Sequence, residues 1–151
     1  MTKELIDELD IKILRELARD GRIGIRELAR KLSKPPSTIL NRIRKLERLG
    51  VIRGYTALIN HRVLGFQVVA LIMLSVEGAY LEEVEKVVAA EPNVKAVYDI
   101  TGEFDVAIIA MFKTIEELDR FIKSLLKNPR VKRSVTSIAF RVVKEEPHVP
   151  F

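Results

Sequence analysis

The chain has 151 residues, enough for one large domain or two small ones with a buried core, and it contains no cysteine. The absence of cysteine excludes disulfides, thiolate metal sites and cysteine nucleophiles. The formal net charge of +5 is divided unevenly, because residues 1–60 hold 14 Lys and Arg against 8 Asp and Glu, whereas residues 61–151 hold 12 against 13. This division predicts two halves with different functions.

The N-terminal sequence alternates charged and apolar residues and lacks the apolar run of a signal peptide. The longest apolar segments elsewhere are interrupted within about ten residues, which is too short for a membrane span. We therefore expect a cytoplasmic protein that has no membrane partner.

Three helices are expected in the first half. Apolar residues at three- and four-residue spacing predict one helix in LDIKILRELARDGR, ending near Gly21, and a shorter one in IRELARKL. In the third, PSTILNRIRKLERLG, Pro36 suits the first helical position and Gly50 suits a left-handed stop.

The third helix divides its side chains between two faces. Ile39, Ile43 and Leu46 recur at the spacing of a core face. A second stripe contains Thr38, Asn41, Arg42 and Lys45. Asn can pair with adenine and Arg with guanine, while Lys attracts phosphate, so this stripe predicts DNA binding. Ser37 and Thr38, at the helix N-terminus, suit phosphate contact.

Nine basic residues lie between positions 26 and 53, where the only acids are Glu27 and Glu47. After Gly50 the segment VIRGYTALIN predicts a β-hairpin turning at Arg53–Gly54, a wing from which Arg53 touches the DNA backbone. A helical bundle with a solvated polar face is the alternative. That alternative does not explain why the basic residues gather around one helix.

The second half predicts four strands and two helices in the order β-α-β-β-α-β, the pattern of a ferredoxin-like sheet with both helices on one face. The strands are expected in FQVVALIMLSV, NVKAVYDIT, EFDVAIIAMF and VKRSVTSIAFRVV. The helices are expected in LEEVEKVVAA and IEELDRFIKSLLK, which are amphipathic.

Two of the predicted strands are apolar on both faces, in residues 68–74 and 106–112. An antiparallel sheet with one wet face should instead alternate. Because two helices cover only one face, we expect the second face to pack on the same sheet of a second copy, in an obligate dimer. The alternative is that one chain covers both faces itself.

The segments LDIKILRELARDGR, PSTILNRIRKLERLGVIRGY and TGEFD, in this order, resemble the leucine-responsive and asparagine-synthesis regulators, the Lrp/AsnC family. The resemblance covers nearly the whole chain. It implies an α+β protein with a winged helix-turn-helix domain over 1–54, a hinge over 55–65 and a ferredoxin-like domain over 66–151. It also implies dimers that assemble into tetramers or octamers and bind an amino acid or a related metabolite.

In this family a Gly-Asp/Glu-Tyr/Phe-Asp turn lies where dimers meet and helps to form the effector pocket. The resemblance therefore assigns the effector to the turn and to one face of the last strand: Thr101, Gly102, Glu103, Phe104, Asp105, Ser134 and Thr136. Carboxylates can accept hydrogen bonds from an ammonium group, and backbone N–H groups or hydroxyls can donate to a carboxylate. Alternatively, Gly102–Glu103 is only a two-residue hairpin turn.

One departure from the family concerns the start of the third helix. Members commonly place a serine directly before the proline that starts this helix, whereas here Lys34 and Pro35 follow Ser33. Proline cannot cap a helix with its side chain, so the register of the helix start on DNA stays open.

These residues and the resemblance together predict a sequence-specific transcription regulator that binds double-stranded DNA and responds to a small effector. The alternative is an architectural protein that binds DNA with little sequence preference and no effector.

An enzyme is not expected, and neither is a cofactor. His61 falls in the predicted hinge and His148 in a proline-flanked tail, so a nucleophile, a base and an orienting residue cannot be assembled. Asp99, Glu103 and Asp105 form an acidic run around a turn, for which a solvated surface is favoured over a metal site.

Overall fold

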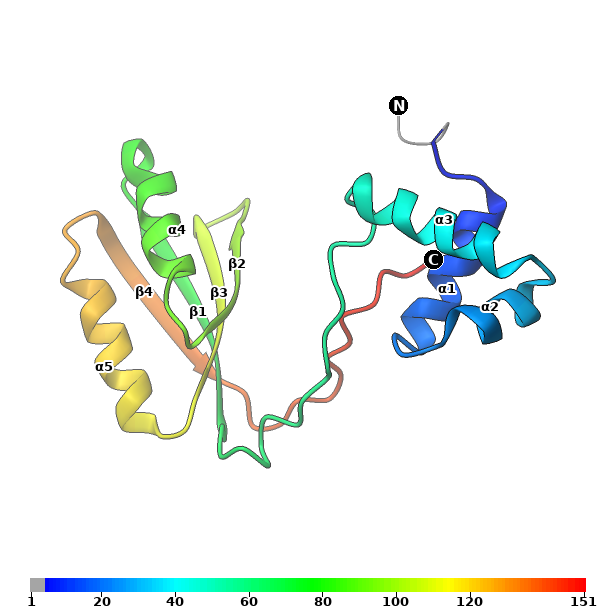
Figure 1. Cartoon of the computed structure of the whole chain (residues 1–151). Helices are drawn as coiled ribbons and strands as arrows, with labels where there is room; N and C mark the ends of the chain where they lie inside the picture. The colour runs from blue at the N-terminus through cyan, green and yellow to red at the C-terminus, as the bar shows by residue number, and fades with distance from the viewer. Residues whose placement is uncertain (1–4) are drawn as a thin grey trace. The chain divides into compact units, whose positions relative to one another are not determined.

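The computed structural model describes residues 5–151 and divides into two compact units. The first holds the chain up to Leu58 together with Glu146–Phe151, and the second holds Ile59–Glu145 (Figure 1). The domain bounds expected from the sequence instead place residues 146–151 in the second domain. The predicted first domain begins in residues 1–4, which lie outside the described residues.

The first unit contains the three predicted helices: α1 (Glu8–Arg19), α2 (Ile25–Leu32) and α3 (Pro36–Arg48). One apolar cluster joins them, made by the buried side chains of Ile13, Leu28, Ala29, Ile39, Ile43 and Leu46. Each helix contributes to this cluster the residues that recur at three- and four-residue spacing in its sequence.

The ends of α3 follow from its proline and glycine residues. Pro36 occupies the first helical turn, and Pro35 precedes it as an N-cap without a side-chain hydrogen bond. Beyond the other end, Gly50 has a φ of 71°, in the left-handed region that glycine adopts without strain. Although no serine caps it, α3 begins at Pro36, as the sequence predicted.

The predicted hairpin over residues 51–60 is not formed, since the segment contains no strand. Val51 and Ile52 instead pack against the helical core. Farther along, the Tyr55 hydroxyl donates a hydrogen bond of 3.0 Å to Oε1 of Glu47, on α3. Val51 and Ile52 thus pack on the helices instead of pairing as a strand, whereas Leu58 is exposed.

The second unit has the predicted β-α-β-β-α-β order, with one short 3-10 helix, η1, added before α4. Its elements are β1 (Val68–Val76), η1 (Gly78–Tyr80), α4 (Leu81–Ala89), β2 (Val94–Asp99), β3 (Val106–Phe112), α5 (Ile115–Leu126) and β4 (Val131–Ile138). The sheet is antiparallel, with strand order β2-β3-β1-β4 (Figure 1).

Both helices cover one face of this sheet. Every second side chain along β1 and β3 points into the core on this face. The apolar stripes of α4 and α5 pack on these side chains with Val84, Val88, Leu118, Phe121 and Leu125. The rings of Phe112 and Phe121 lie 5.4 Å apart at an interplanar angle of 45°.

The opposite face of the sheet is also apolar and has no helix on it. The register of β1 and β3 pairs Val69 with Met111, Leu71 with Ile109 and Met73 with Ala107 on this face. We call it the open face. Its Leu71 side chain is 45% exposed, and the neighbouring Tyr98 and Val135 are also exposed.

We predict that the substitution Ile72→Ala lowers the free energy of unfolding by about 2–5 kcal/mol, because the side chain is fully buried beneath the helices. Chemical denaturation at one fixed protein concentration measures this loss. Ile115→Ala, the same change at a half-exposed side chain on α5, is the control and should cost less than about 1 kcal/mol. Equal losses would contradict this assignment of the core.

Candidate nucleic-acid interface and ligand site

The exposed side of α3 carries a stripe of polar and basic side chains. A helix turns by about 100° per residue, so positions 37, 41, 44 and 48 lie one above another. These positions are all exposed, and we call them the outer stripe: Ser37, Asn41, Arg44 and Arg48. Within residues 5–151, neither Arg44 nor Arg48 forms an ion pair. Two guanidinium groups are therefore available to a polyanion.

More exposed basic side chains precede α3. Arg26 and Arg30 lie one turn apart on α2, and Lys34 lies in the turn that leads to α3. Arg53, which the sequence predicted to touch DNA, is exposed beyond the core residues Val51 and Ile52. These cations add sequence-independent attraction for phosphate.

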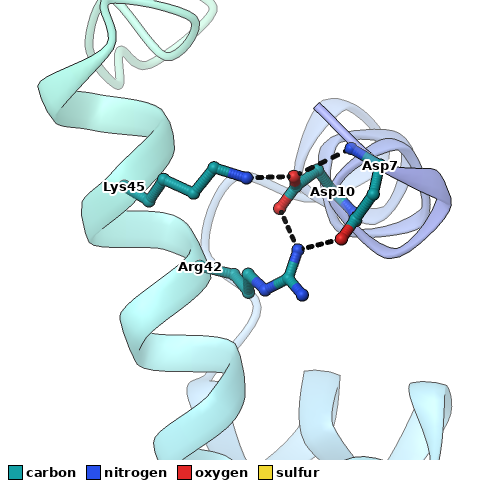
Figure 2. Close-up of polar contacts among 4 residues, drawn as sticks. All are labelled: Asp7, Asp10, Arg42 and Lys45. Atoms are coloured by element: carbon teal, nitrogen blue, oxygen red, sulfur yellow. Dashed lines mark hydrogen bonds and ion pairs between the residues drawn. The ribbon is translucent and has the colours of Figure 1, made fainter. Parts of the chain in front are cut away.

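Two residues of the predicted DNA-binding stripe are engaged inside the protein. Figure 2 shows Arg42 and Lys45 reaching from α3 to Asp7 and Asp10 at the start of α1. Nζ of Lys45 lies 2.6 Å from Oδ2 of Asp10, and Arg42 donates to Oδ1 of Asp10 at 3.2 Å. Arg42 also donates to the carboxylate of Asp7. We call these four residues the α1–α3 ion-pair cluster.

The two acids of this cluster also cap α1. The backbone N–H of Asp10 donates to Oδ1 of Asp7 at 2.9 Å, and the backbone N–H of Asp7 donates to Oδ2 of Asp10 at 3.1 Å. This capping box satisfies N–H groups that the first turn of a helix leaves unpaired. Each carboxylate thus serves α1 and α3 at once.

The burial of Asp10 makes loss of any of its partners costly in free energy. Asp10 has no exposed surface, so its charge is tolerable only because cations and N–H groups surround it. Removing one partner from a buried pair costs about 3–5 kcal/mol. Arg42 and Lys45 are themselves only 30% and 27% exposed.

Contact between Asp7 and Arg42 stabilises the ionised form of each of these two side chains. The Arg42 guanidinium, followed by the Asp10 N–H, lowers the pKa of Asp7 to about 2. The carboxylates of Asp7 and Asp10 in turn raise the pKa of Arg42 above its usual value. Because two cations face two anions, the cluster adds little net charge to the surface of α3.

The predicted stripe therefore combined two sides of α3. Asn41 is exposed, whereas Thr38, Arg42 and Lys45 lie on the flank of the helix and are partly buried. The stripe omitted Arg44 and Arg48. A signal for the pairing was present in the sequence, because two acids spaced i, i+3 in the first turn of α1 match two bases spaced i, i+3 on α3.

In the second unit, the predicted ligand turn connects β2 to β3. Its Gly102 has a φ of 112°, which favours glycine. The turn is wider than a two-residue hairpin, because the N–H of Ile100 donates to the carbonyl of Asp105 at 2.9 Å beyond the strand ends. Thr101, Gly102 and Glu103 are exposed between these two residues.

Asp105 holds the end of β1 in place. Its carboxylate accepts a hydrogen bond of 2.8 Å from the N–H of Val76, and its own N–H donates to the carbonyl of Leu74 at 2.9 Å. The register between β1 and β4 shifts between Ser75 and Val76, so this carboxylate satisfies an N–H group at an irregular point of the sheet.

The strand residue that reaches the turn is Arg133, which the sequence analysis did not select. Its guanidinium lies 2.8 Å from Oε1 of Glu103 and 5.0 Å from the centre of the Phe104 ring. The side chains of Glu103 and Arg133 are 70% and 57% exposed. An exposed acid and an exposed base thus lie side by side next to an aromatic ring.

Ser134 and Thr136 lie on the other face of β4. The register pairs them with Leu74 and Ile72, which face the helix-covered core, whereas Arg133 pairs with Ser75. Within one chain, the structure therefore does not bring these two hydroxyls to the turn that holds Glu103.

The turn has the groups that an amino acid requires. The Glu103 carboxylate can accept from an ammonium group, and the Arg133 guanidinium can donate two hydrogen bonds to a carboxylate. Because the ion pair of Glu103 and Arg133 is exposed, little free energy is lost when a ligand group replaces either side chain as the partner of the other.

Residues 5–151 contain neither a cluster of metal ligands nor a membrane-spanning helix. No group of three His, Cys, Asp or Glu side chains in this range could hold a metal ion. No helix in the same range is long and apolar enough to cross a membrane.

Both units match known protein families. Residues 6–53 match the model of a winged helix-turn-helix DNA-binding domain. Residues 69–149 match the model of the Lrp/AsnC ligand-binding domain, which covers more than half of the chain.

Whole-chain relatives agree with both matches. An HTH-type transcriptional regulator of Pyrococcus furiosus is 43% identical over 93% of this chain and 95% of its own length. The HTH-type transcriptional regulator FL11 of Pyrococcus horikoshii is 34% identical over 96% of each chain.

Solved structures show the same fold. A transcriptional regulator of Neisseria meningitidis, crystallised as a complex with L-methionine, is 29% identical and superposes with a TM-score of 0.89 over 96% of each chain. AsnC of E. coli is 25% identical, with a TM-score of 0.85 over 93% of this chain and 96% of its own. These relatives are transcription regulators and not enzymes. The chain belongs to the Lrp/AsnC family of DNA-binding transcription regulators.

Proposed function

We propose that this protein binds specific DNA sequences through α3, assembles through the open face of its sheet, and changes its DNA binding in response to an amino acid or a related metabolite. The outer stripe is the observation that carries the proposal. It places on one exposed side of the helix an amide and two guanidinium groups that form no ion pair with residues 5–151.

Side-chain chemistry supports sequence recognition by this helix. Asn41 can form two hydrogen bonds with adenine, and an arginine can do the same with guanine. Ser37 lies in the first turn of α3, where backbone N–H groups favour contact with a phosphate. Thr38 is partly buried next to Ser37, and Arg53 is exposed beyond α3. We propose both as contacts to the DNA backbone.

The open face supports assembly. Apolar side chains of β1 and β3 that no helix covers would lose contact with water if the same face of a second copy packed on them. Tetramers or octamers would then need further contacts, for which the ligand turn at one end of the sheet is the proposed place.

The turn supports effector binding at such a contact. Glu103 and Arg133 offer one half of an amino-acid site, and Ser134 and Thr136 face away from them in the same chain. A second chain is therefore needed to bring all of the proposed effector residues around one ligand. The methionine bound to the Neisseria relative supports an amino acid as the chemical class of the ligand.

We expect Arg44→Ala to weaken DNA binding by about 1–3 kcal/mol, because an arginine contact in a DNA groove contributes that much. Fluorescence anisotropy with a duplex enriched from a randomised pool measures the change. Arg19→Ala, on α1, is the control because that side chain already pairs with Glu16. Equal affinity of Arg44→Ala and wild type would exclude Arg44 from the interface.

The same titrations separate the regulator from the architectural alternative. A specific regulator binds the enriched duplex about 10³-fold or more tightly than a random duplex of the same length. An architectural protein binds both alike, with a steep dependence on salt.

We expect Leu71→Asp to convert the assembly into monomers, because a charge on the open face would be buried without a partner. Analytical ultracentrifugation gives the mass. Leu126→Asp is a matched control, since Leu126 is 49% exposed at the end of α5 and Leu71 is 45% exposed. An unchanged mass for the Leu71 variant would show that the open face is not the interface.

We expect calorimetric titration with the twenty amino acids to identify at least one ligand, and Glu103→Gln to weaken its binding by about tenfold or more, as expected when an ammonium loses its charged acceptor. Glu116→Gln, an exposed acid on α5, is the control. Asp105 is unsuitable as a probe because its carboxylate holds the end of β1. If no amino acid binds wild type, either the ligand belongs to another class or the protein is architectural and has no effector.

A further inference from the structure

The proposed recognition helix meets α1 through charges that are buried rather than solvated. Both carboxylate oxygens of Asp10 are occupied, one by Lys45 at 2.6 Å and the other by Arg42 at 3.2 Å. Asp10 is fully buried. Arg42 and Lys45 cannot turn to a phosphate without leaving this charge unpaired inside the protein.

The geometry of the cluster restricts rotation of α3 about its own axis. Arg42 and Lys45 are one helical turn apart, so two points on one flank of the helix are fixed to α1. The capping box between Asp7 and Asp10 fixes the acids in turn. Even a small rotation of α3 about its axis would move both cations away from Asp10 and would turn the outer stripe away from its present direction.

Apolar packing alone constrains this rotation less sharply. The α3 core residues are Ile39, Ile43 and Leu46, and aliphatic side chains tolerate small shifts through rotamer changes. Hydrogen bonds to a charged group weaken steeply when distances or angles change. The apolar core therefore fixes which side of α3 faces inward, and the ion-pair cluster fixes the rotation of the helix more finely.

We propose that Asp7 and Asp10 are positioning residues for DNA recognition: they hold Arg42 and Lys45 on α1 and thereby direct the outer stripe toward DNA. This inference rests on the proposed DNA binding by α3. It changes the roles of Arg42 and Lys45 from DNA contacts to anchors of the recognition helix.

The deciding variant is Asp10→Asn, which keeps the shape and one acceptor oxygen but removes the charge. Glu8→Gln is the matched control. It removes one negative charge from the same helical turn, and Glu8 is exposed and, among residues 5–151, pairs with Lys12. General attraction to DNA predicts slightly tighter binding for both variants, because each makes the protein more positive.

We expect the opposite for Asp10→Asn on a duplex enriched by wild type from a randomised pool. Its affinity should fall about tenfold, the order of one lost base contact, while Glu8→Gln binds at least as well as wild type. Affinity for a random duplex should change little. The slope of log affinity against log salt should stay the same, because no phosphate contact is lost or gained.

Asp7→Asn is a second variant that tests the same inference if Asp10→Asn does not fold. Asp7 is half exposed, so its loss disturbs the interior less than loss of Asp10. It should show the same loss of preference for the enriched duplex, to a smaller degree. Circular dichroism at the temperature of the titrations establishes that each variant is folded.

Two results would overturn the inference. If Asp10→Asn binds both duplexes more tightly, with a salt slope steeper by about 0.9 for each released cation, then Arg42 and Lys45 contact phosphate. If Asp10→Asn and Glu8→Gln behave alike, the cluster has no positioning role. Wild type that binds no duplex at all would instead contradict the proposed function itself.

Discussion

The structure of the first unit depends on the charge of Asp10, which is buried in full and must be neutralised where it lies. Two bases of α3 neutralise that charge, and the backbone N–H of Asp7, the N-cap of α1, adds a hydrogen bond. The requirement decides which side of α3 faces α1. Because the apolar side is already committed to the core, Arg44 and Arg48 remain on the side that faces solvent.

A comparable constraint acts on the sheet. Strands β1 and β3 place apolar side chains on both faces, but α4 and α5 cover only one of them. A chain with this pattern is incomplete as a monomer in terms of apolar burial. One chain also does not complete the proposed effector site, since Arg133 and Ser134 point to opposite faces of β4. The proposed assembly of several chains would cover the open face and complete the proposed effector site at the same time.

Local periodicity was sufficient to predict most of the fold from the sequence. Helix α2 spans the residues that were expected, and β1 begins two residues after the predicted start at Phe66. The hairpin after Gly50 failed because a short apolar run can pack on helices as well as pair with a strand. The roles of Arg42 and Arg133 depend on partners about thirty residues away in the chain, which periodicity does not report.

The two charged clusters have similar chemistry but different burial, and burial determines what each can do. In the cluster of Asp7, Asp10, Arg42 and Lys45, low exposure makes exchange of a partner expensive, so the contact serves as a fixed anchor. The pair of Glu103 and Arg133 is well exposed, so water screens it and a zwitterion can replace each partner at small cost. A responsive site must be able to exchange its contacts, whereas a recognition helix must keep them. The exposed pair of Glu103 and Arg133 and the buried cluster of Asp10 thus fit the two roles proposed for them.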